Sequence, residues 1–140
     1  MHKLSALAGH NITKLRTAIF ITFPGNCKNA LTLYQACFGG KLHFEIFKKK
    51  LQGFTEMLVI SGSLVSDRII IHGSDLVHDE GRIPGNHMSV FLHCKNTYDR
   101  KALIEKLAFG KRNFYIKNCD DQKLIEITDA FDVRWVLFVK

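Results

Sequence analysis

The sequence predicts a single α+β domain made of two successive halves, each with the element order strand–helix–strand–strand–strand (βαβββ). Two segments with helical spacing of apolar residues each follow a short strand-like run, and further strand-like runs come after each of them. A polar stretch containing Gly81, Pro84 and Gly85 separates the halves. At 140 residues the chain has the length of one domain with its own core. We therefore expect one domain over 17–140, with modules at about 17–75 and 86–140 joined by linker 76–85, after a partly disordered leader over 1–16.

The first half opens with a run of β-branched and aromatic residues over 18–23, which Pro24-Gly25 ends. Asn26 is placed to cap a helix over Cys27–Phe38, where apolar residues recur at helical spacing. Gly39-Gly40 is a typical end for that helix. Three strands are predicted next, at Lys41–Phe47, Glu56–Ser61 and Arg68–His72, with turns expected at 61–63 and 66–67.

The second half repeats this order. Residues 87–94 alternate in character, with Met88, Val90, Leu92 and Cys94 on one face and His87, Ser89, Phe91 and His93 on the other. Thr97 can cap a helix that extends to about Ala108, and Gly110 closes it. Strands are then predicted at 113–117, 124–128 and 133–139. The two halves form an internal repeat of roughly 70 residues at the level of elements.

The charge balance favours an anionic partner. The formal net charge is +7 and the isoelectric point is about 9.4. The positive residues are spread along the chain, and the densest cluster, Lys48–Lys50, is not interleaved with stacking aromatics. This pattern disfavours a nucleic-acid interface.

Cysteine usage and hydropathy point to a reducing, aqueous compartment. The four cysteines form no CxxC pair and no short cluster with histidine, which argues against both a disulfide framework and a structural zinc site. The longest apolar runs, such as Val136–Val139, are too short to cross a bilayer. We expect a cytoplasmic protein with no membrane partner.

Specific motifs relate the chain to a known family. The first strand and helix read Phe-Ile-Thr-Phe-Pro-Gly-Asn at 20–26, then Ala30-Leu31, Leu33-Tyr34 and Cys37-Phe38-Gly39-Gly40. Near the end, Thr128-Asp129 precedes Val133-Arg134-Trp135. Over about 17–139 this pattern resembles the PhnB-like branch of the vicinal-oxygen-chelate (glyoxalase/bleomycin resistance/dioxygenase) superfamily.

The resemblance implies a particular architecture. Each module is expected to be a curved mixed sheet with a helix on its outer face, and paired modules are expected to enclose a cleft in a homodimer. The chain departs from the branch at Asp129-Ala130-Phe131-Asp132, where the branch usually has Asp-Pro-Phe-Gly, and at 118–122, where it often has Trp-Gly. Both departures lie near the expected mouth of the cleft, so a substrate shared with the branch is not predicted.

The donor residues of the superfamily's metalloenzymes are largely missing. Those enzymes take His, Gln or Glu ligands from the first and last strands of each module. Here the predicted strands 18–23 and 133–139 contain no His, Gln, Asp or Glu. No cofactor is therefore expected, and a divalent metal would have to depend on His72 and His87, the remaining weak candidates.

The candidates for the expected cleft are His72, His87, Ser89, Phe91 and Arg134. His87, Ser89 and Phe91 share one face of their predicted strand, and His72 ends another. Arg134 alternates with Val136 and Phe138, and its guanidinium is suited to a carboxylate or phosphate. Trp135 falls on the opposite face and is assigned to the core.

The leading hypothesis is a protein that binds a small organic molecule, anionic or amphipathic, in a dimer cleft without the usual metal site. Two alternatives stay open. One is a metal-dependent lyase, isomerase or dioxygenase of the glyoxalase superfamily that uses His72 and His87. The other is a basic nucleic-acid-binding module, which the spread of the charges disfavours. Whether the chain is an enzyme is left open.

Overall fold

The computed structural model describes residues 16–48, 57–75, 82–109 and 121–140. Most of the expected leader (1–15), part of the expected linker (76–81) and the predicted strand at 113–117 lie outside these ranges. Within the described ranges no helix is long and apolar enough to span a membrane. The elements are β1 (Ile19–Thr22), α1 (Cys27–Phe38), β2 (Lys41–Ile46), β3 (Val59–Val65), β4 (Ile70–Ser74), β5 (Val90–His93), α2 (Thr97–Leu107), β6 (Leu124–Thr128) and β7 (Arg134–Phe138).

Each half forms a mixed sheet, and the two sheets repeat one topology. The first has the order β1-β4-β3-β2, with β1 parallel to β4 and the other neighbours antiparallel. The second has the order β5-β7-β6, with β5 parallel to β7 and β6 antiparallel to it. The two halves therefore share one pattern: β4 and β7, the last strands, are each parallel to the first strand of their half. Each of them is also antiparallel to the strand that precedes it in the chain, β3 or β6. The predicted repeat of elements corresponds to a repeat of strand pairing.

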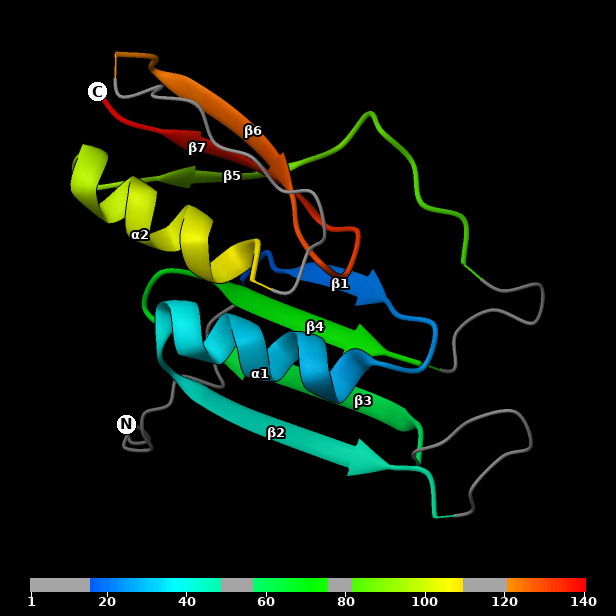
Figure 1. Cartoon of the computed structure of the whole chain (residues 1–140). Coiled ribbons are helices and arrows are strands. Elements are labelled where there is room, and N and C mark those ends of the chain that lie inside the picture. Colours follow the sequence, from blue (N-terminus) through cyan, green and yellow to red (C-terminus); the bar gives the residue numbers. More distant parts are fainter. Residues whose placement is uncertain (1–15, 49–56, 76–81, 110–120) are drawn as a thin grey trace, which may run out of the picture.

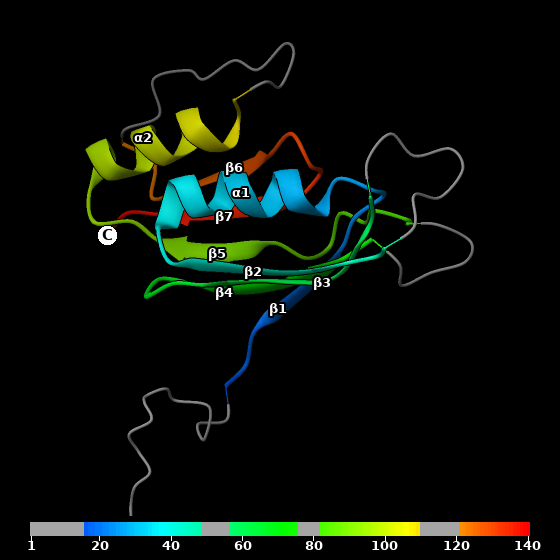
Figure 2. The ribbon, with the colours of Figure 1, turned by 90° about the horizontal axis from the view of Figure 1, so that it is seen from below.

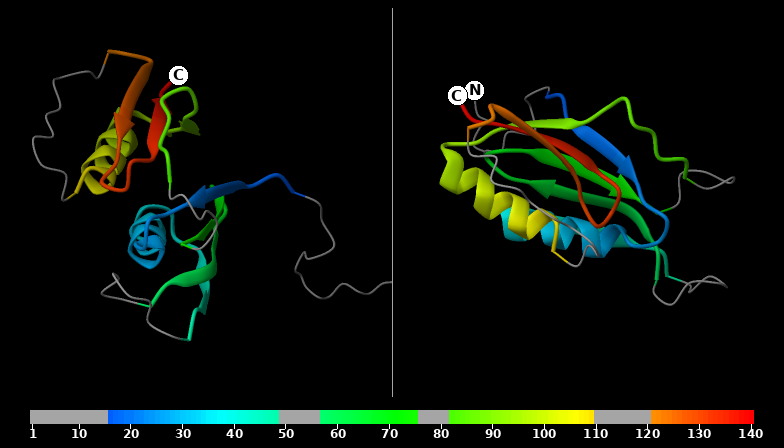
Figure 3. Two further views of the ribbon diagram at one scale, coloured as in Figure 1. Left: turned by 90° about the vertical axis from the view of Figure 1, so that its right-hand side faces the viewer. Right: turned by 45° about the horizontal axis from the view of Figure 1, so that its top comes forward.

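The helices α1 and α2 lie side by side on one side of the molecule, and the sheets lie on the other (Figures 1, 2 and 3). The core is continuous between the halves. Trp135 of β7 is fully buried, with ring centroids 5.5 Å from both Tyr34 and Phe38 of α1. Helix α1 thus packs against the sheet of its own half and against the last strand of the other.

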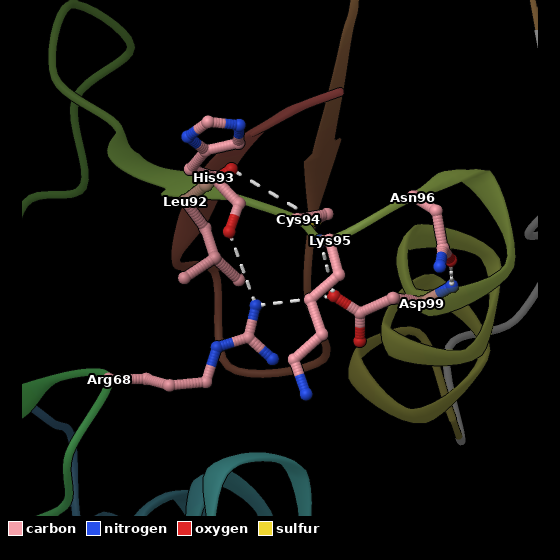
Figure 4. A network of polar contacts seen from close by, with 7 residues as sticks. All are labelled: Arg68, Leu92, His93, Cys94, Lys95, Asn96 and Asp99. Carbon is pink, nitrogen blue, oxygen red and sulfur yellow. Dashed lines mark hydrogen bonds and ion pairs between the residues drawn. The ribbon is translucent and has the colours of Figure 1, made fainter. Parts of the chain in front are cut away.

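A polar network also joins the halves (Figure 4). Arg68, in the turn between β3 and β4, donates to the His93 carbonyl at 3.3 Å and pairs with Asp99 of α2 at 3.4 Å. Its guanidinium lies 5.9 Å from the ring centre of Phe38. One side chain of the first half therefore contacts the end of β5 and the start of α2.

The sequence-based boundaries of β3 and β4 were wrong. Strand β3 runs through Ser61-Gly62-Ser63, which had been assigned to a turn. At Gly62 an added Cβ would lie 3.0 Å from Leu31 of α1 and 3.1 Å from Phe44 of β2. This glycine therefore permits close packing of the helix on the sheet, and it does not make a turn. The turn lies at Ser66, whose backbone N–H donates to the Ile69 carbonyl at 3.0 Å, so β4 starts only at Ile70.

The helix caps also differ from expectation. Asn26 is the N-cap residue of α1 but makes no side-chain capping bond. Asp75, which follows β4, supplies the acceptor: its Oδ1 accepts from the N–H groups of Gly25 at 3.0 Å and Cys27 at 3.1 Å. In α2 the cap is Asn96, which accepts from the Asp99 N–H at 2.8 Å, and Thr97 is the first helical residue. The carboxylate of Asp75, which directly follows β4, therefore makes the capping hydrogen bonds that were expected from Asn26.

This cap gives a stability prediction. Asp75→Ala removes the acceptor for three backbone N–H groups, since Oδ2 also accepts from Val59 at 2.9 Å. We expect a loss of about 2 kcal/mol in the free energy of unfolding, measured by urea titration. Asn26→Ala is the matched control and should change stability by less than about 0.5 kcal/mol, because the Asn26 Oδ1 has no partner in the described chain. Equal losses in the two variants would contradict this assignment of the cap.

Candidate functional site

The candidate site lies on the sheet faces that point away from the helices, called here the open faces. On the helix side, Ile71, Trp135 and Leu137 are fully buried. Alternation along the strands places their neighbours on the open faces. In the first sheet Phe20 lies beside His72 in the parallel register of β1 and β4. Phe20 is 59% exposed, which is unusual for a phenylalanine in a strand.

A hollow of about 400 Å³ lies between the two halves at one end of the open faces. We call it the β1–β5 hollow. Its apolar walls come from β1, the segment after the linker, the start of β5 and the turn before β7: Ile19, Phe20, Ile21, Ile83, Pro84, Met88, Val90 and Val133. Its polar lining is Thr22, Arg82, Ser89, Asp132 and Arg134. The volume and the mixture of many apolar and few polar groups are those of small-molecule sites.

Both arginines of the hollow are engaged by the chain itself. Arg134 forms an ion pair with Glu126 of β6, and Ser89 Oγ lies 3.4 Å from the same carboxylate oxygen. Arg82 pairs with Asp132 at 3.0 Å and donates to the Phe131 carbonyl at 3.3 Å. Arg134 Nε is buried and has no hydrogen-bond partner among the described residues. The hollow therefore carries two arginines whose charges are balanced by carboxylates of the chain.

The turn that forms one wall of the hollow is held by a buried carboxylate. Asp129, 1% exposed, accepts through Oδ1 from the N–H groups of Phe131 at 2.8 Å and Val133 at 3.0 Å. Its Oδ2 accepts from the Tyr34 hydroxyl at 2.6 Å and from Trp135 Nε1 at 2.9 Å. Burial, followed by the charge of Asp129, raises the pKa of Tyr34 above its usual range, so the phenol stays protonated and donates. Asp129 thus ties the wall of the hollow to helix α1.

The last residue of the same turn has an unusual backbone conformation. Asp132 stands where the resembling branch has glycine, and it has a positive φ of 66°. Aspartate is among the few non-glycine residues that enter this region at modest cost. Asp132 therefore adopts a conformation that glycine also enters readily, and its carboxylate holds Arg82.

The structure separates the predicted site residues into three groups. Ser89 and Arg134 line the hollow and share Glu126 as a partner. Phe91 is on the open face beyond the hollow, where its ring stacks with Phe138 at 5.8 Å. The two histidines are both exposed and lie outside the lining: His72 is on β4, and His87 is in the segment before β5.

Two residues that line the hollow, Phe20 and Arg82, and one that pairs with its Arg134, Glu126, escaped the sequence-based selection. Phe20 had been treated only as part of an apolar strand, and Arg82 as part of a linker. Glu126 could have been found, because alternation along 124–128 puts it on the face opposite the buried Ile127. Its pairing with Arg134 depends on the antiparallel register of β6 and β7, in which Thr128 is opposite Arg134.

The described residues do not fit the metal centre of the superfamily. They contain no cluster of three or more His, Cys, Asp or Glu side chains that could hold a metal ion. Strands β1 and β7 contribute none of these residue types. We therefore derive no catalytic step through a metal.

The described cysteines are not activated nucleophiles. Cys27, Cys37 and Cys94 are free thiols. Burial raises the pKa of Cys27 to about 12 and that of Cys37 to about 11. Burial also raises the pKa of Cys94. Because the thiolate is the reactive form, these groups are suited to packing and poorly suited to nucleophilic catalysis.

Comparison with known proteins shows the fold. Neither a protein-family model nor a curated protein matches the sequence. The structure is similar to PA1353 from Pseudomonas aeruginosa, with 20% identity, a TM-score of 0.69, and coverage of 91% of this chain and 98% of that one. It is also similar to the PhnB protein from Bacillus cereus, with 17% identity, a TM-score of 0.59 and coverage of 90% and 100%.

A third similar structure is the fosfomycin resistance protein FosX from Mesorhizobium loti, with 8% identity, a TM-score of 0.55 and coverage of 89% and 90%. The predicted α+β fold with two mixed sheets is therefore confirmed, and it is shared with the PhnB protein and with FosX.

Proposed function

We propose that this chain is a vicinal-oxygen-chelate protein that binds a small amphipathic organic molecule in the β1–β5 hollow, without the superfamily's usual metal. The observation that carries the proposal is the hollow itself. Both halves of the repeat contribute to it, its walls are mainly apolar, and Ser89 and Arg134 place polar groups at its edge. A ligand with an apolar body and one polar end matches this distribution.

We further propose that a second copy of the chain covers the open faces and completes the cleft. Phe20 is 59% exposed and Phe91 is 60% exposed, and Val65 at the end of β3 is also exposed. These side chains lie on sheet faces that no helix of the described chain covers. Uncovered apolar sheet surface of this kind favours association, and a homodimer is the commonest form it takes.

The experiment combines metal analysis with a ligand screen on the natively purified protein. We expect a dimer by light scattering and less than about 0.1 metal ion per chain, because too few donors converge for tight binding. Near-stoichiometric metal that is lost in His87→Ala would contradict the metal-free proposal and favour the metalloenzyme alternative.

Matched variants locate the ligand. Ser89→Leu should fill the hollow, whereas Thr32→Leu adds the same side chain at an exposed position of α1, away from the lining and from the open faces. Neutral aromatic fragments that raise the melting temperature of the wild type should also stabilise Thr32→Leu, and should lose at least about three-quarters of their effect in Ser89→Leu. Equal stabilisation of the two variants would place the ligand elsewhere.

A further inference from the structure

We infer that the ligand of the β1–β5 hollow is uncharged, for example an amide or a ketone. It would not be a free carboxylate or phosphate. This inference rests on the function proposed above and specifies its ligand. It also runs against the first expectation from the net charge of +7, which favours an anion.

The first step concerns the charges at the hollow. A free guanidinium there would attract anions, but both guanidinium groups already have carboxylate partners: Arg134 has Glu126, and Arg82 has Asp132. The four charges of these residues cancel. The excess positive charge of the chain is therefore not concentrated in the hollow.

The second step concerns competition. Glu126 is held next to Arg134 by the β6–β7 pairing, in which Thr128 is opposite Arg134. An intramolecular partner acts at an effective concentration of millimolar or more, without a new loss of translational freedom. A free carboxylate must displace this partner and leave Glu126 facing the incoming charge. An uncharged ligand avoids both costs.

The third step concerns hydration. The hollow is lined by several apolar residues, among them Ile83, Met88 and Val133. An ion would lose hydration against these apolar walls, which therefore favour a neutral molecule.

The test uses two probes that differ only in charge, 2-naphthamide and 2-naphthoate. Binding is measured by titration with backbone amide NMR shifts, in wild type, Glu126→Gln and Glu105→Gln. Glu105 is exposed on α2 and does not line the hollow, so its variant makes the same change in net charge at a distance. We expect wild type to bind the amide at least about five-fold more tightly than the carboxylate.

Glu126→Gln frees Arg134, so the affinity for 2-naphthoate should rise at least about five-fold, while that for the amide changes less than two-fold. Glu105→Gln should resemble wild type. A wild-type preference for 2-naphthoate, or an equal rise in both variants, would overturn the inference and leave the proposed binding function standing. If neither probe shifts residues of the hollow, the proposed function fails, and the inference fails with it.

Discussion

Asp129→Ala is expected to lose about 3–5 kcal/mol of the free energy of unfolding, because four donors depend on one buried carboxylate. The backbone N–H groups of Phe131 and Val133 lose Oδ1, and the Tyr34 hydroxyl and Trp135 Nε1 lose Oδ2. Asp129 and both of its side-chain donors are buried. Water therefore cannot replace the missing oxygen atoms without opening the core.

Urea titration followed by tryptophan fluorescence measures the effect, because Trp135 is the single tryptophan of the chain and lies in this network. Tyr34→Phe is the control, since it removes one of the four bonds and keeps the ring in place. It should cost about 1 kcal/mol. A loss of about 1 kcal/mol or less for Asp129→Ala itself would show that the network contributes little to stability.

Gly40→Ala is expected to destabilise the fold by about 3 kcal/mol or more. Gly40 has a φ of 95°, a region that side-chain-bearing residues rarely adopt. An added Cβ would overlap the Val65 carbonyl oxygen and would lie 2.7 Å from the Ser66 Cβ. Val65 is opposite Lys41 in the β2–β3 register, so relief of the overlap would disturb the sheet.

The preceding residue provides the control for this prediction. Gly39 also has a positive φ, of 73°, but an added Cβ there meets nothing within 4 Å. Gly39→Ala should therefore cost only the backbone strain, about 1 kcal/mol, in the same urea titration. If the two alanine variants lost the same stability, the steric argument at Gly40 would be wrong.

Local signals in the sequence predicted the local structure well. The helical spacing and the two glycines placed α1 at Cys27–Phe38, which are its observed bounds. Alternation put Arg134 and Trp135 on opposite faces of β7, and the burial of Trp135 confirms its place in the core. These features depend on neighbouring residues alone, so they can be read from the order of residues along the chain.

Features that depend on distant residues were predicted poorly. Gly62 was assigned to a turn because glycine is common in turns. Its neighbours Leu31 and Phe44 lie close to it only after α1 has packed on the sheet, so the sequence around Gly62 does not indicate them. Asp75 caps a helix 48 positions earlier in the chain, which no local pattern indicates. The hollow has the same origin, since β1 meets the turn before β7 only after both halves have formed.

The bond between Tyr34 and Asp129 joins residues 95 positions apart. The core side of α1 is therefore completed by β7, which is synthesised long after α1. Until that strand emerges, Tyr34 and Phe38 lack their Trp135 neighbour. Folding that waits on contacts of such long sequence separation is slow and exposes apolar surface meanwhile. During synthesis the first half would therefore be the part of the chain most in need of chaperone protection.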